Sequence, residues 1–270
     1  MKEKKYLQVE RYYDEDASNF DSRYFKNPVL QRIRQDMREE VKRFKFSNVL
    51  EIGFGTGLDI VHFAKTHPDV RFSGIDISGA MCTLAKDKVA EWNLKNVDIK
   101  KGTVEDIESL FKDTQFDMIY VFFGALNTVD DINKTAKILN AHTSPGGIMV
   151  LSFVNKYYLA GVILEVMKLR FRKAFSRLNP EWGGYSPSKY LPSATYSFSN
   201  IKEAFADFLL IRKKGYSIIY PAWYYKRLIR ILTKFLSFLW KTDKLLNKTP
   251  LWCLGEYSLY VFQKPDNLGN

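Results

Sequence analysis

The chain has 270 residues, of which 46% are hydrophobic and 26% are charged, and it contains two cysteines. This composition is typical of a globular protein and excludes a disordered chain or a disulfide framework. The formal charge is +11, but residues 156–250 hold 18 of the 41 Lys and Arg and only 5 of the 30 Asp and Glu. The positive charge therefore belongs to one segment, and the rest of the chain is nearly neutral.

Targeting and metal-binding signals are not apparent. The N-terminus lacks the apolar segment of a signal peptide, and no run of about 18 uncharged apolar residues occurs. Cys82 and Cys253 are too far apart in sequence for a metal knuckle, so we expect no metal. We expect a cytoplasmic protein, with contact at a membrane surface left open, and no nucleic-acid partner because no known binding module occurs. The sequence gives no oligomeric state.

Short apolar runs alternate with helical patterns up to Val154. The runs that predict strands are residues 48–53, 71–78, 97–103, 116–123 and 148–154. The patterns that predict helices are residues 58–67, 78–92 and 128–143, the last capped by Thr128, and residues 144–147 predict a turn. Apolar strands separated by helices predict a mostly parallel sheet covered on both faces.

The pattern changes after Asn155. In chain order it predicts a helix over 157–175, a loop over 179–193, a helix capped by Ser199 or Asn200, a strand over 209–219, a basic helix over 223–246 and a strand over 256–264. Taken together, these strands and helices predict an α/β fold with a doubly wound, mostly parallel, seven-stranded sheet and helical insertions that form a cap. The predicted divisions are a helical cover (1–47), a ligand-binding core (48–155), a cap insertion (156–200) and the C-terminal part of the sheet (201–270).

The glycine-rich turn after the first predicted strand is the most informative segment. Residues 49–59 read VLEIGFGTGLD, and the turn places Gly53, Gly55 and Gly57 before a helix. Glycines there allow positive φ and let a ligand lie against bare backbone. A dinucleotide fingerprint reads G-x-G-x-x-G and cradles a pyrophosphate, which Glu51 would repel. An acid there suits a ligand with an ammonium or sulfonium group, and Asp76, at the end of the next strand, suits the two hydroxyls of a ribose.

These features resemble the class I S-adenosylmethionine-dependent methyltransferases, which have a Rossmann-like fold. The resemblance covers about residues 12–155. The segments that match the family in order are YDEDASNFDSRY (13–24), the glycine turn, GIDIS (74–78), GTVEDI (102–107), FDMIYVFFGALNTV (116–129) and SPGGIMVLSF (144–153). Together they imply that the chain binds S-adenosyl-L-methionine, with S-adenosyl-L-homocysteine as the product.

The resemblance also implies a set of cofactor-binding residues. The residues that it places at the cofactor are Tyr13, Glu51, Gly53, Gly55, Gly57, Asp76, Ile77, Met81, Thr103, Val104 and Phe122. Glu51 and the backbone of Gly53 and Gly55 would hold the methionine part, and Asp76 the ribose. Thr103 departs from the family, which often has Asp there, and Asn127 with Thr128 replaces a His pair of many relatives.

Methyl transfer is an in-line displacement that depends on alignment and exclusion of water, so no catalytic residue is obligatory. Candidates for a base or an orienting group are Tyr13, Asp14 and Tyr24, while the three histidines are expected to be solvated or packed. Candidates for a substrate wall are Phe123, Tyr157, Trp182 and Tyr185. They predict a small, apolar or aromatic acceptor that offers an O, N or C nucleophile.

The predicted helix over 223–246 carries Lys226, Arg230, Lys234, Lys241 and Lys244 at spacings that put them on one face, with apolar residues elsewhere. This pattern is typical of a cap helix with a solvated basic face, and also of a helix at a membrane interface. Three hypotheses follow: a methyltransferase of small molecules, a methyltransferase of lipid-like substrates at a membrane surface, and a cofactor-binding partner protein without catalysis.

Overall fold

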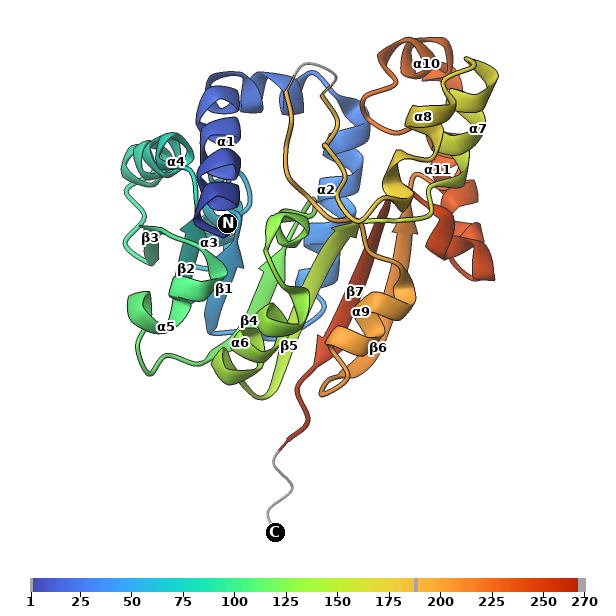
Figure 1. Cartoon of the computed structure of the whole chain (residues 1–270). Helices are drawn as coiled ribbons and strands as arrows, with labels where there is room; N and C mark the ends of the chain where they lie inside the picture. The colour runs from blue at the N-terminus through green and yellow to red at the C-terminus, as the bar shows by residue number, and fades with distance from the viewer. Residues whose placement is uncertain (1, 187–188, 267–270) are drawn as a thin grey trace.

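A seven-stranded sheet forms the centre of the computed structural model, which describes residues 2–186 and 189–266 (Figure 1). The strand order is β3-β2-β1-β4-β5-β7-β6. The strands are β1 (Asn48–Ile52), β2 (Arg71–Asp76), β3 (Val97–Lys101), β4 (Phe116–Val121), β5 (Thr143–Val154), β6 (Leu209–Tyr216) and β7 (Tyr257–Gln263). The first five are parallel and β7 runs antiparallel to both neighbours, which confirms the predicted fold class.

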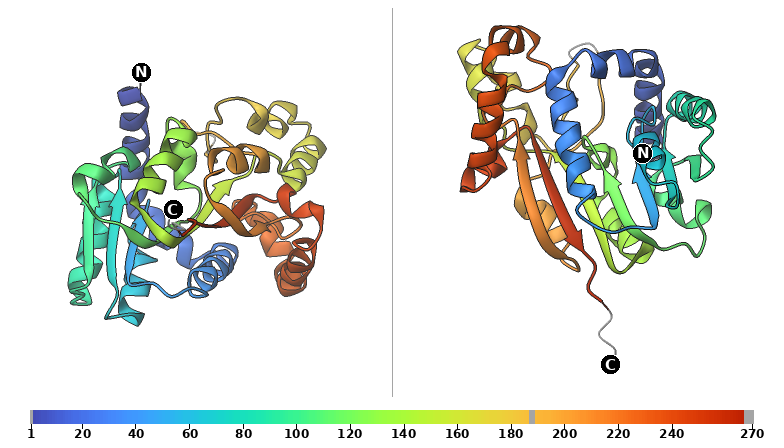
Figure 2. Two further views of the ribbon diagram at one scale, coloured as in Figure 1. Left: turned by 90° about the horizontal axis from the view of Figure 1, so that it is seen from below. Right: turned by 180° about the vertical axis from the view of Figure 1, so that it is seen from behind.

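Helices cover both faces of this sheet (Figures 1 and 2). The helices α2 (Pro28–Val41), α3 (Ile60–Thr66) and α4 (Gly79–Glu91) bury one cluster of apolar side chains against it. The helices α5 (Ile107–Leu110), α6 (Ile132–His142) and α9 (Phe198–Ala204) bury a second cluster on the opposite face. Each fully buried Leu, Ile or Phe contributes about 1.5–3 kcal/mol, so the two clusters hold the sheet in a fixed geometry.

The N-terminal helix α1 (Lys2–Phe25) is tied to the carboxyl-end edge of the sheet. The Asp14 carboxylate accepts from the Ser78 hydroxyl at 2.6 Å and from the Ala80 N–H at 3.0 Å. Asp21 accepts from the Thr56 hydroxyl and the Lys88 ammonium, each at 2.5 Å. These contacts join α1 to the glycine turn and to α4, so it covers the edge where the parallel strands end.

Several predicted helix starts are wrong by a few residues, because other side chains cap the helices. The Asp131 carboxylate, not Thr128, accepts from the backbone of Asn133 and Lys134 at the start of α6. Ser197, not Ser199 or Asn200, caps α9, and Asn200 completes a reciprocal capping box with it. The helix after the glycine turn begins at Ile60 rather than at once.

The predicted turn at residues 144–147 lies instead inside β5. Gly146 has φ +72°, and the register between β4 and β5 shifts between Phe116 and Met118. Backbone bonds from Gly146 N–H to Lys264 O and from Lys264 N–H to Gly147 O continue the ladder past the irregularity. The Pro and two Gly thus form a bulge within a strand rather than a turn before it.

The predicted helix over 157–175 is broken in two. It forms α7 (Leu159–Met167) and α8 (Phe171–Ala174), followed by a 3-10 turn (Ser176–Leu178). Leu169 has φ +57°, and the Arg170 N–H bonds back to Glu165 O at 2.9 Å, which closes α7. A left-handed Leu cannot continue an α-helix, so the chain changes direction there.

The predicted basic helix over 223–246 is also broken. It forms α10 (Lys226–Ile231), a 3-10 turn (Thr233–Phe235) and α11 (Leu236–Leu246), with another 3-10 turn at Pro250–Leu254. The Thr233 hydroxyl donates to Ile229 O and Arg230 O, a contact that bends helices. The five cations therefore do not follow one continuous helix, and Lys244 pairs with Asp36 of α2 at 3.5 Å. Within the described residues, no helix combines the length and apolarity needed to cross a membrane.

Candidate functional site

A cavity opens at the carboxyl ends of β1, β2 and β4, beneath α1. Its floor comes from the glycine turn after β1, the end of β2 and the chain after β4. The aromatic residues that line it are Tyr6, Tyr12, Tyr13, Phe20, Tyr24, Phe122, Phe123, Trp182, Tyr185, Trp223 and Tyr257. Ligands of doubly wound sheets bind at this edge, so the cavity is the candidate functional site.

The three glycines of the turn have different roles. Gly53, Gly55 and Gly57 all have positive φ, between +57° and +80°. Gly53 and Gly55 line the cavity, and a Cβ on Gly53 would lie 2.4 Å from the Ala125 Cβ. Gly57 is not among the lining residues; a Cβ there would lie 3.0 Å from the Ala85 Cβ of α4. Gly57 was predicted at the cofactor, but in the structure it lets a helix pack closely.

Asp76 ends β2 and faces the cavity. Its carboxylate accepts from the Gly55 N–H at 2.8 Å and from the Ser78 N–H at 2.9 Å, so the glycine turn and the start of α4 fix its position. Burial raises its pKa to about 6, although these backbone bonds favour the charged form. Each carboxylate oxygen keeps a further lone pair for a ligand hydroxyl.

The predicted adenine-binding residues also meet at the cavity. Ile77, Met81, Val104 and Phe122 line it, and so does Thr103 at the start of a 3-10 turn (Val104–Asp106). The Thr103 hydroxyl donates to the Asp106 carboxylate at 2.8 Å. The same hydroxyl accepts from the Asp106 N–H in a reciprocal capping box, so one lone pair remains to accept from an amine.

Glu51 does not line the cavity, contrary to the prediction. Its side chain is 2% exposed and accepts from the Tyr120 hydroxyl at 2.8 Å. Burial and the nearby Asp59 carboxylate raise its pKa well above the usual range. Side chains alternate along a strand, and Ile52, which does line the cavity, points to the opposite side of β1.

The candidate catalytic residues of α1 divide into two groups. Tyr13 and Tyr24 line the cavity, and burial raises the pKa of the Tyr13 hydroxyl, which disfavours it as a base. Asp14 does not line the cavity, because its carboxylate caps α4 through Ser78 and Ala80. It is an anchor of α1, which contradicts the predicted catalytic role.

Aromatic side chains from distant segments form the far end of the cavity. The Trp182 and Tyr185 rings lie 4.8 Å apart, and the Tyr185 ring lies 5.3 Å from that of Trp223. The Trp223 Nε1–H donates to the Tyr257 hydroxyl at 3.1 Å, and the Tyr257 ring lies 5.7 Å from that of Phe123. Trp223 and Tyr257 were not predicted, because no local signal brings α10 and β7 to this edge.

Tyr157, another predicted substrate residue, lies elsewhere. Its side chain is 49% exposed, and it lines a separate cavity inside the cap with residues of α7 and α8. The structure therefore removes it from the main cavity, whereas Phe123, Trp182 and Tyr185 do line it.

Arg34 of α2 is a charged residue of the cavity that the sequence analysis missed. Its guanidinium carbon lies 4.8 Å from the Tyr24 ring centroid and 4.7 Å from that of Phe123. One terminal nitrogen forms an ion pair with the buried Asp59, which Arg38 also binds at 2.7 Å. The Nε–H of Arg34 has no hydrogen-bond partner among the described residues.

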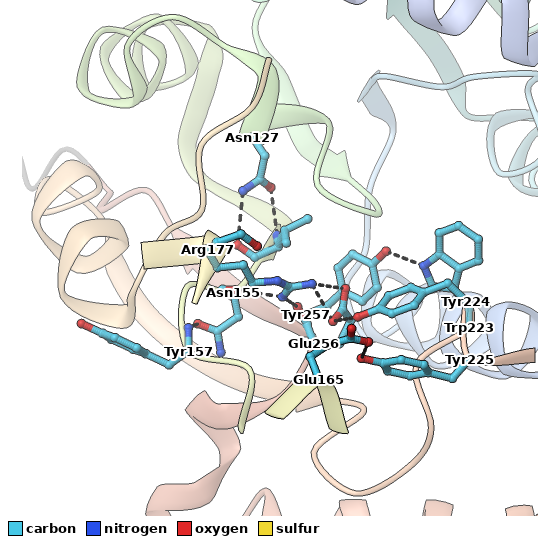
Figure 3. A network of polar contacts seen from close by, with 12 residues as sticks. Asn127, Asn155, Tyr157, Glu165, Arg177, Trp223, Tyr224, Tyr225, Glu256 and Tyr257 are labelled. Carbon is cyan, nitrogen blue, oxygen red and sulfur yellow. Dashed lines mark hydrogen bonds and ion pairs between the residues drawn. The ribbon is translucent and has the colours of Figure 1, made fainter. Parts of the chain in front are cut away.

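A buried polar network fixes the cap to the sheet behind the aromatic wall (Figure 3). Arg177 donates to both Glu256 carboxylate oxygens at 2.8 Å and to Asn155 O at 3.1 Å. The Tyr224 hydroxyl donates to the same carboxylate at 2.9 Å. The Arg177 guanidinium also lies 4.7 Å from the Trp182 ring, so this ion pair holds one side of the cavity wall.

Asn127 clamps the chain after β4 to neighbouring segments. Its amide donates to Val154 O at 3.2 Å and to Ala194 O at 2.6 Å, and its side-chain oxygen accepts from the Val154 N–H at 2.9 Å. These bonds join the 3-10 turn after β4 (Ala125–Thr128) to the end of β5 and to the cap.

Histidines and metal-binding clusters do not line this cavity. His142 is buried against Glu108 at 3.0 Å, and burial, with a contribution from Arg38, lowers the pKa of His62 to about 4. No group of three or more His, Cys, Asp or Glu with metal-binding geometry occurs in the described ranges. Asp16 and Asp76 are the only carboxylates among the described lining residues, and Asp16 is paired with Arg23 at 2.8 Å.

Known proteins share both the sequence pattern and the fold. A family model described as a methyltransferase domain matches residues 49–147. The ubiquinone/menaquinone biosynthesis C-methyltransferase UbiE of Geotalea daltonii is 29% identical over 203 residues, which is 70% of this chain and 81% of that protein. An uncharacterised protein of Methanocaldococcus jannaschii is 27% identical over 221 residues, which is 78% of this chain and 77% of that protein.

Solved structures match over nearly the whole length. The [4+2]-cyclase SpnF has a TM-score of 0.64 at 16% identity, with 96% of both chains covered. A possible histamine N-methyltransferase of Thermotoga maritima has a TM-score of 0.58 at 15% identity, with 95% of this chain and 99% of that chain covered. At these identities the structural likeness shows the fold alone.

Proposed function

Because the chain belongs to the class I S-adenosylmethionine-dependent methyltransferases, we propose that the cavity beneath α1 binds this cofactor and transfers its methyl group to a small apolar or aromatic acceptor. The position of Asp76 carries the assignment of the site. Its carboxylate faces the cavity and is held by the Gly55 and Ser78 N–H groups. That geometry suits the two ribose hydroxyls and places the rest of the cofactor along the open glycine turn.

The cavity offers suitable residues for both the adenine and the methionine part of the cofactor. Ile77 and Met81 offer apolar surface to the adenine, and the remaining lone pair of the Thr103 hydroxyl suits its amino group. The methionine part would lie against Gly53 and Gly55, which have no side chain to exclude it. Glu51 lies outside the lining, so we assign it no direct contact with the cofactor.

We assign the carboxylate of the methionine part to Arg34. Its guanidinium lines the cavity, and its Nε–H lacks a partner in the described part of the chain. Asp59 binds both Arg34 and Arg38, and its single negative charge cannot balance both, so a second carboxylate would suit the remaining Arg34 donor. Hydrogen bonds between guanidinium and carboxylate groups are among the stronger ones in proteins.

The chemistry rests on alignment rather than on a strong base. The cofactor supplies an activated methyl group on sulfur, and the acceptor displaces it in line. Among the described lining residues, the carboxylates of Asp16 and Asp76 are already engaged, and no histidine is present. The protein's contribution is to exclude water with the aromatic wall and to hold the acceptor opposite the methyl group.

The aromatic end of the cavity supports the acceptor class. Trp182, Tyr185, Trp223 and Tyr257 present flat, largely apolar surface with few hydrogen-bonding groups. Such a wall binds planar or apolar molecules through burial and ring stacking. The Geotalea relative, whose name points to quinone biosynthesis, agrees with an acceptor of this class. The alternative of a cofactor-binding partner protein without catalysis is disfavoured by family membership.

Transfer of tritium from labelled S-adenosylmethionine to a panel of phenols, quinols and aromatic amines tests this proposal. We expect label in at least one of these acceptors. Trp223→Ala removes one ring of the wall and should lower kcat/KM for that acceptor by about ten-fold or more. Trp92→Ala, which removes an exposed tryptophan outside the cavity, is the matched control and should leave it unchanged. Transfer to polar aliphatic compounds alone would contradict the acceptor class.

A further inference from the structure

The outer surface of the cap combines exposed apolar side chains with exposed positive charge. Its two parts are α7–α8 and α10–α11, which lie side by side (Figures 1 and 2). The end of α7 reaches the start of α10: the Tyr225 hydroxyl donates to Glu165 at 3.4 Å, and the Lys168 ammonium lies 4.8 Å from the Tyr225 ring. The two insertions therefore form one surface, which we call the cap face.

Apolar side chains protrude from both parts of the cap face. On the α7–α8 side, Met167 and Leu169 are 76% and 78% exposed. On the α10–α11 side, Ile231 is 75% exposed and Phe238 is 66% exposed. Leu169 also adopts positive φ, a conformation that Leu rarely takes, and it lies at the tip of the turn between the helices. Large apolar side chains this exposed mark an interaction surface.

The charge of the cap face has one sign. The Lys and Arg that it exposes are Lys168, Arg170, Arg172, Lys173, Lys226, Arg227, Arg230, Lys234, Lys241, Lys244 and Lys248. The two acids of α7–α8 and α10–α11, Glu165 and Asp243, are both buried. The Asp243 carboxylate accepts hydrogen bonds from the backbone N–H groups of residues 218–220. The outward surface is therefore cationic and apolar. Glu165 still pairs with Lys168 at 3.1 Å and lies within 4.0 Å of Arg170 and Lys173. Lys244 pairs with Asp36 of α2 at 3.5 Å.

We propose that the cap face docks on an anionic lipid bilayer. Exposed Met, Leu, Ile and Phe would enter the interface between headgroups and acyl chains, while the surrounding cations meet the negative surface potential. A protein partner would be expected to meet a mixed pattern of charge, and a nucleic acid would not need protruding apolar groups. The combination of both features on one surface fits a lipid surface.

A second cavity borders both the cap face and the main cavity. It lies inside the cap, and its rim includes Leu159, Phe175 and Leu178, each nearly half exposed. It shares Trp182 and Tyr185 with the main cavity, so these two rings separate the two spaces. On the proposed function, docking would put this apolar opening next to the bilayer, where an acceptor with an apolar chain resides.

Flotation with vesicles of phosphatidylcholine and phosphatidylglycerol tests the docking. We expect the chain to float with these vesicles, to release from them at high salt because the Debye length falls, and not to float with phosphatidylcholine alone. Arg172→Gln with Lys234→Gln should weaken vesicle binding by about ten-fold or more. Lys95→Gln with Lys112→Gln makes the same charge change at the opposite end of the sheet and should bind as the wild type.

Substitution of two exposed apolar residues of the cap face distinguishes insertion into the bilayer from simple charge attraction. Leu169→Asn tolerates the positive φ, and Phe238→Gln keeps a good helix former in α11. Together they should weaken vesicle binding by about five-fold or more, whereas Leu7→Gln with Leu209→Gln, exposed leucines away from the cap, should not. Failure of the wild type to float, or equal binding by either cap pair and its control, would overturn the proposal. Binding of S-adenosylhomocysteine by every variant, as in the wild type, would show that the fold and the cofactor site are intact.

Discussion

Asp76 is a carboxylate whose burial raises its pKa, while backbone hydrogen bonds from Gly55, Ile77 and Ser78 favour the ionised form. With a pKa of about 6, it is largely ionised above pH 7 and gains a proton as the pH falls below 6. In the proposed site the ionised form would accept two ribose hydroxyls, whereas the protonated form would lose part of that capacity.

Affinity for S-adenosylhomocysteine should therefore fall at acidic pH. We expect the Kd at pH 5 to be about ten-fold higher than at pH 8, because only the ionised fraction binds tightly. Calorimetric titration between pH 5 and pH 8 measures this Kd. Asp76→Asn cannot ionise and should show weak binding with little dependence on pH. A wild-type Kd that does not change between pH 8 and pH 5 would contradict the assignment.

Arg34 offers a second test at the same scale. Arg34→Met should weaken binding of S-adenosylhomocysteine by about ten-fold or more, because a charged hydrogen bond is lost. It should leave binding of methylthioadenosine unchanged, since that compound lacks the amino-acid part. Asp59 keeps Arg38 as a partner at 2.7 Å, so the fold should survive. Equal losses for both compounds would show that Arg34 only supports the structure.

Substitution of Gly57 in the glycine turn should change the stability of the fold without changing the affinity for the cofactor. Gly57→Ala forces a Cβ to within 3.0 Å of Ala85 at φ +80° and should destabilise the fold by about 1–3 kcal/mol. It should leave the Kd for S-adenosylhomocysteine within about two-fold, because Gly57 does not line the cavity. Thermal unfolding and calorimetry measure the two effects. A large loss of affinity with an unchanged Tm would return Gly57 to the binding site.

At this scale the sequence indicates the glycine turn and Asp76, but not the direction of each side chain, since Gly57, Glu51 and Asp14 do not line the cavity. Asp76 follows from the spacing of strand and turn, and it does face the cavity. Glu51 was placed by resemblance, although the alternation along β1 already puts it on the side opposite Ile52. Arg34 carries no local signal, because its place depends on how α2 packs across the sheet.

At the scale of elements, the cap is held to the sheet by the Arg177–Glu256 ion pair. Both residues are buried, and Glu256 immediately precedes β7. Removing one partner of such a pair leaves an uncompensated charge, which costs more than the pair contributes. The aromatic wall at Trp182 and Tyr185 packs on Arg177, so the anchor and the cavity are linked.

Glu256→Gln should therefore lower the free energy of unfolding by about 3–5 kcal/mol, as measured by denaturant titration. The double variant Arg177→Met with Glu256→Gln removes the unpaired charge as well and should recover part of that loss. If the single variant is as stable as the wild type, the ion pair does not anchor the cap.

The hydrophobic pattern of the sequence predicts the core strands but not the breaks in the cap helices. The strands of the core are predicted to within a few residues, because apolar runs of that length are unambiguous between helices. The two long helices predicted in the cap are both broken in the structure. The sequence does not indicate the breaks, since the helical pattern continues through Leu169 and Thr233. The break at Leu169 is a left-handed residue, and the one at Thr233 is a hydroxyl bonded back to the preceding turn. Both depend on tertiary packing.

At the scale of the whole molecule, the charge of +11 is divided between two parts with different surroundings. The sheet and its covering helices are nearly neutral and surround the cavity, while the insertions before β6 and β7 carry the excess on the cap face. The sequence predicted this division by counting alone. It could not predict that both insertions come together, because that contact joins residues about 60 apart through Glu165 and Tyr225.

The central claim is that the cavity beneath α1 holds S-adenosylmethionine through Asp76. Calorimetric titration with S-adenosylhomocysteine, at pH 8, tests it on three proteins: the wild type, Asp76→Ala and Asp69→Ala, the last removing an exposed acid outside the cavity. We predict equal affinity for the wild type and Asp69→Ala, and a loss of about 100-fold or more for Asp76→Ala, because two hydrogen bonds to a charged group are removed. Unchanged affinity in Asp76→Ala would contradict the account.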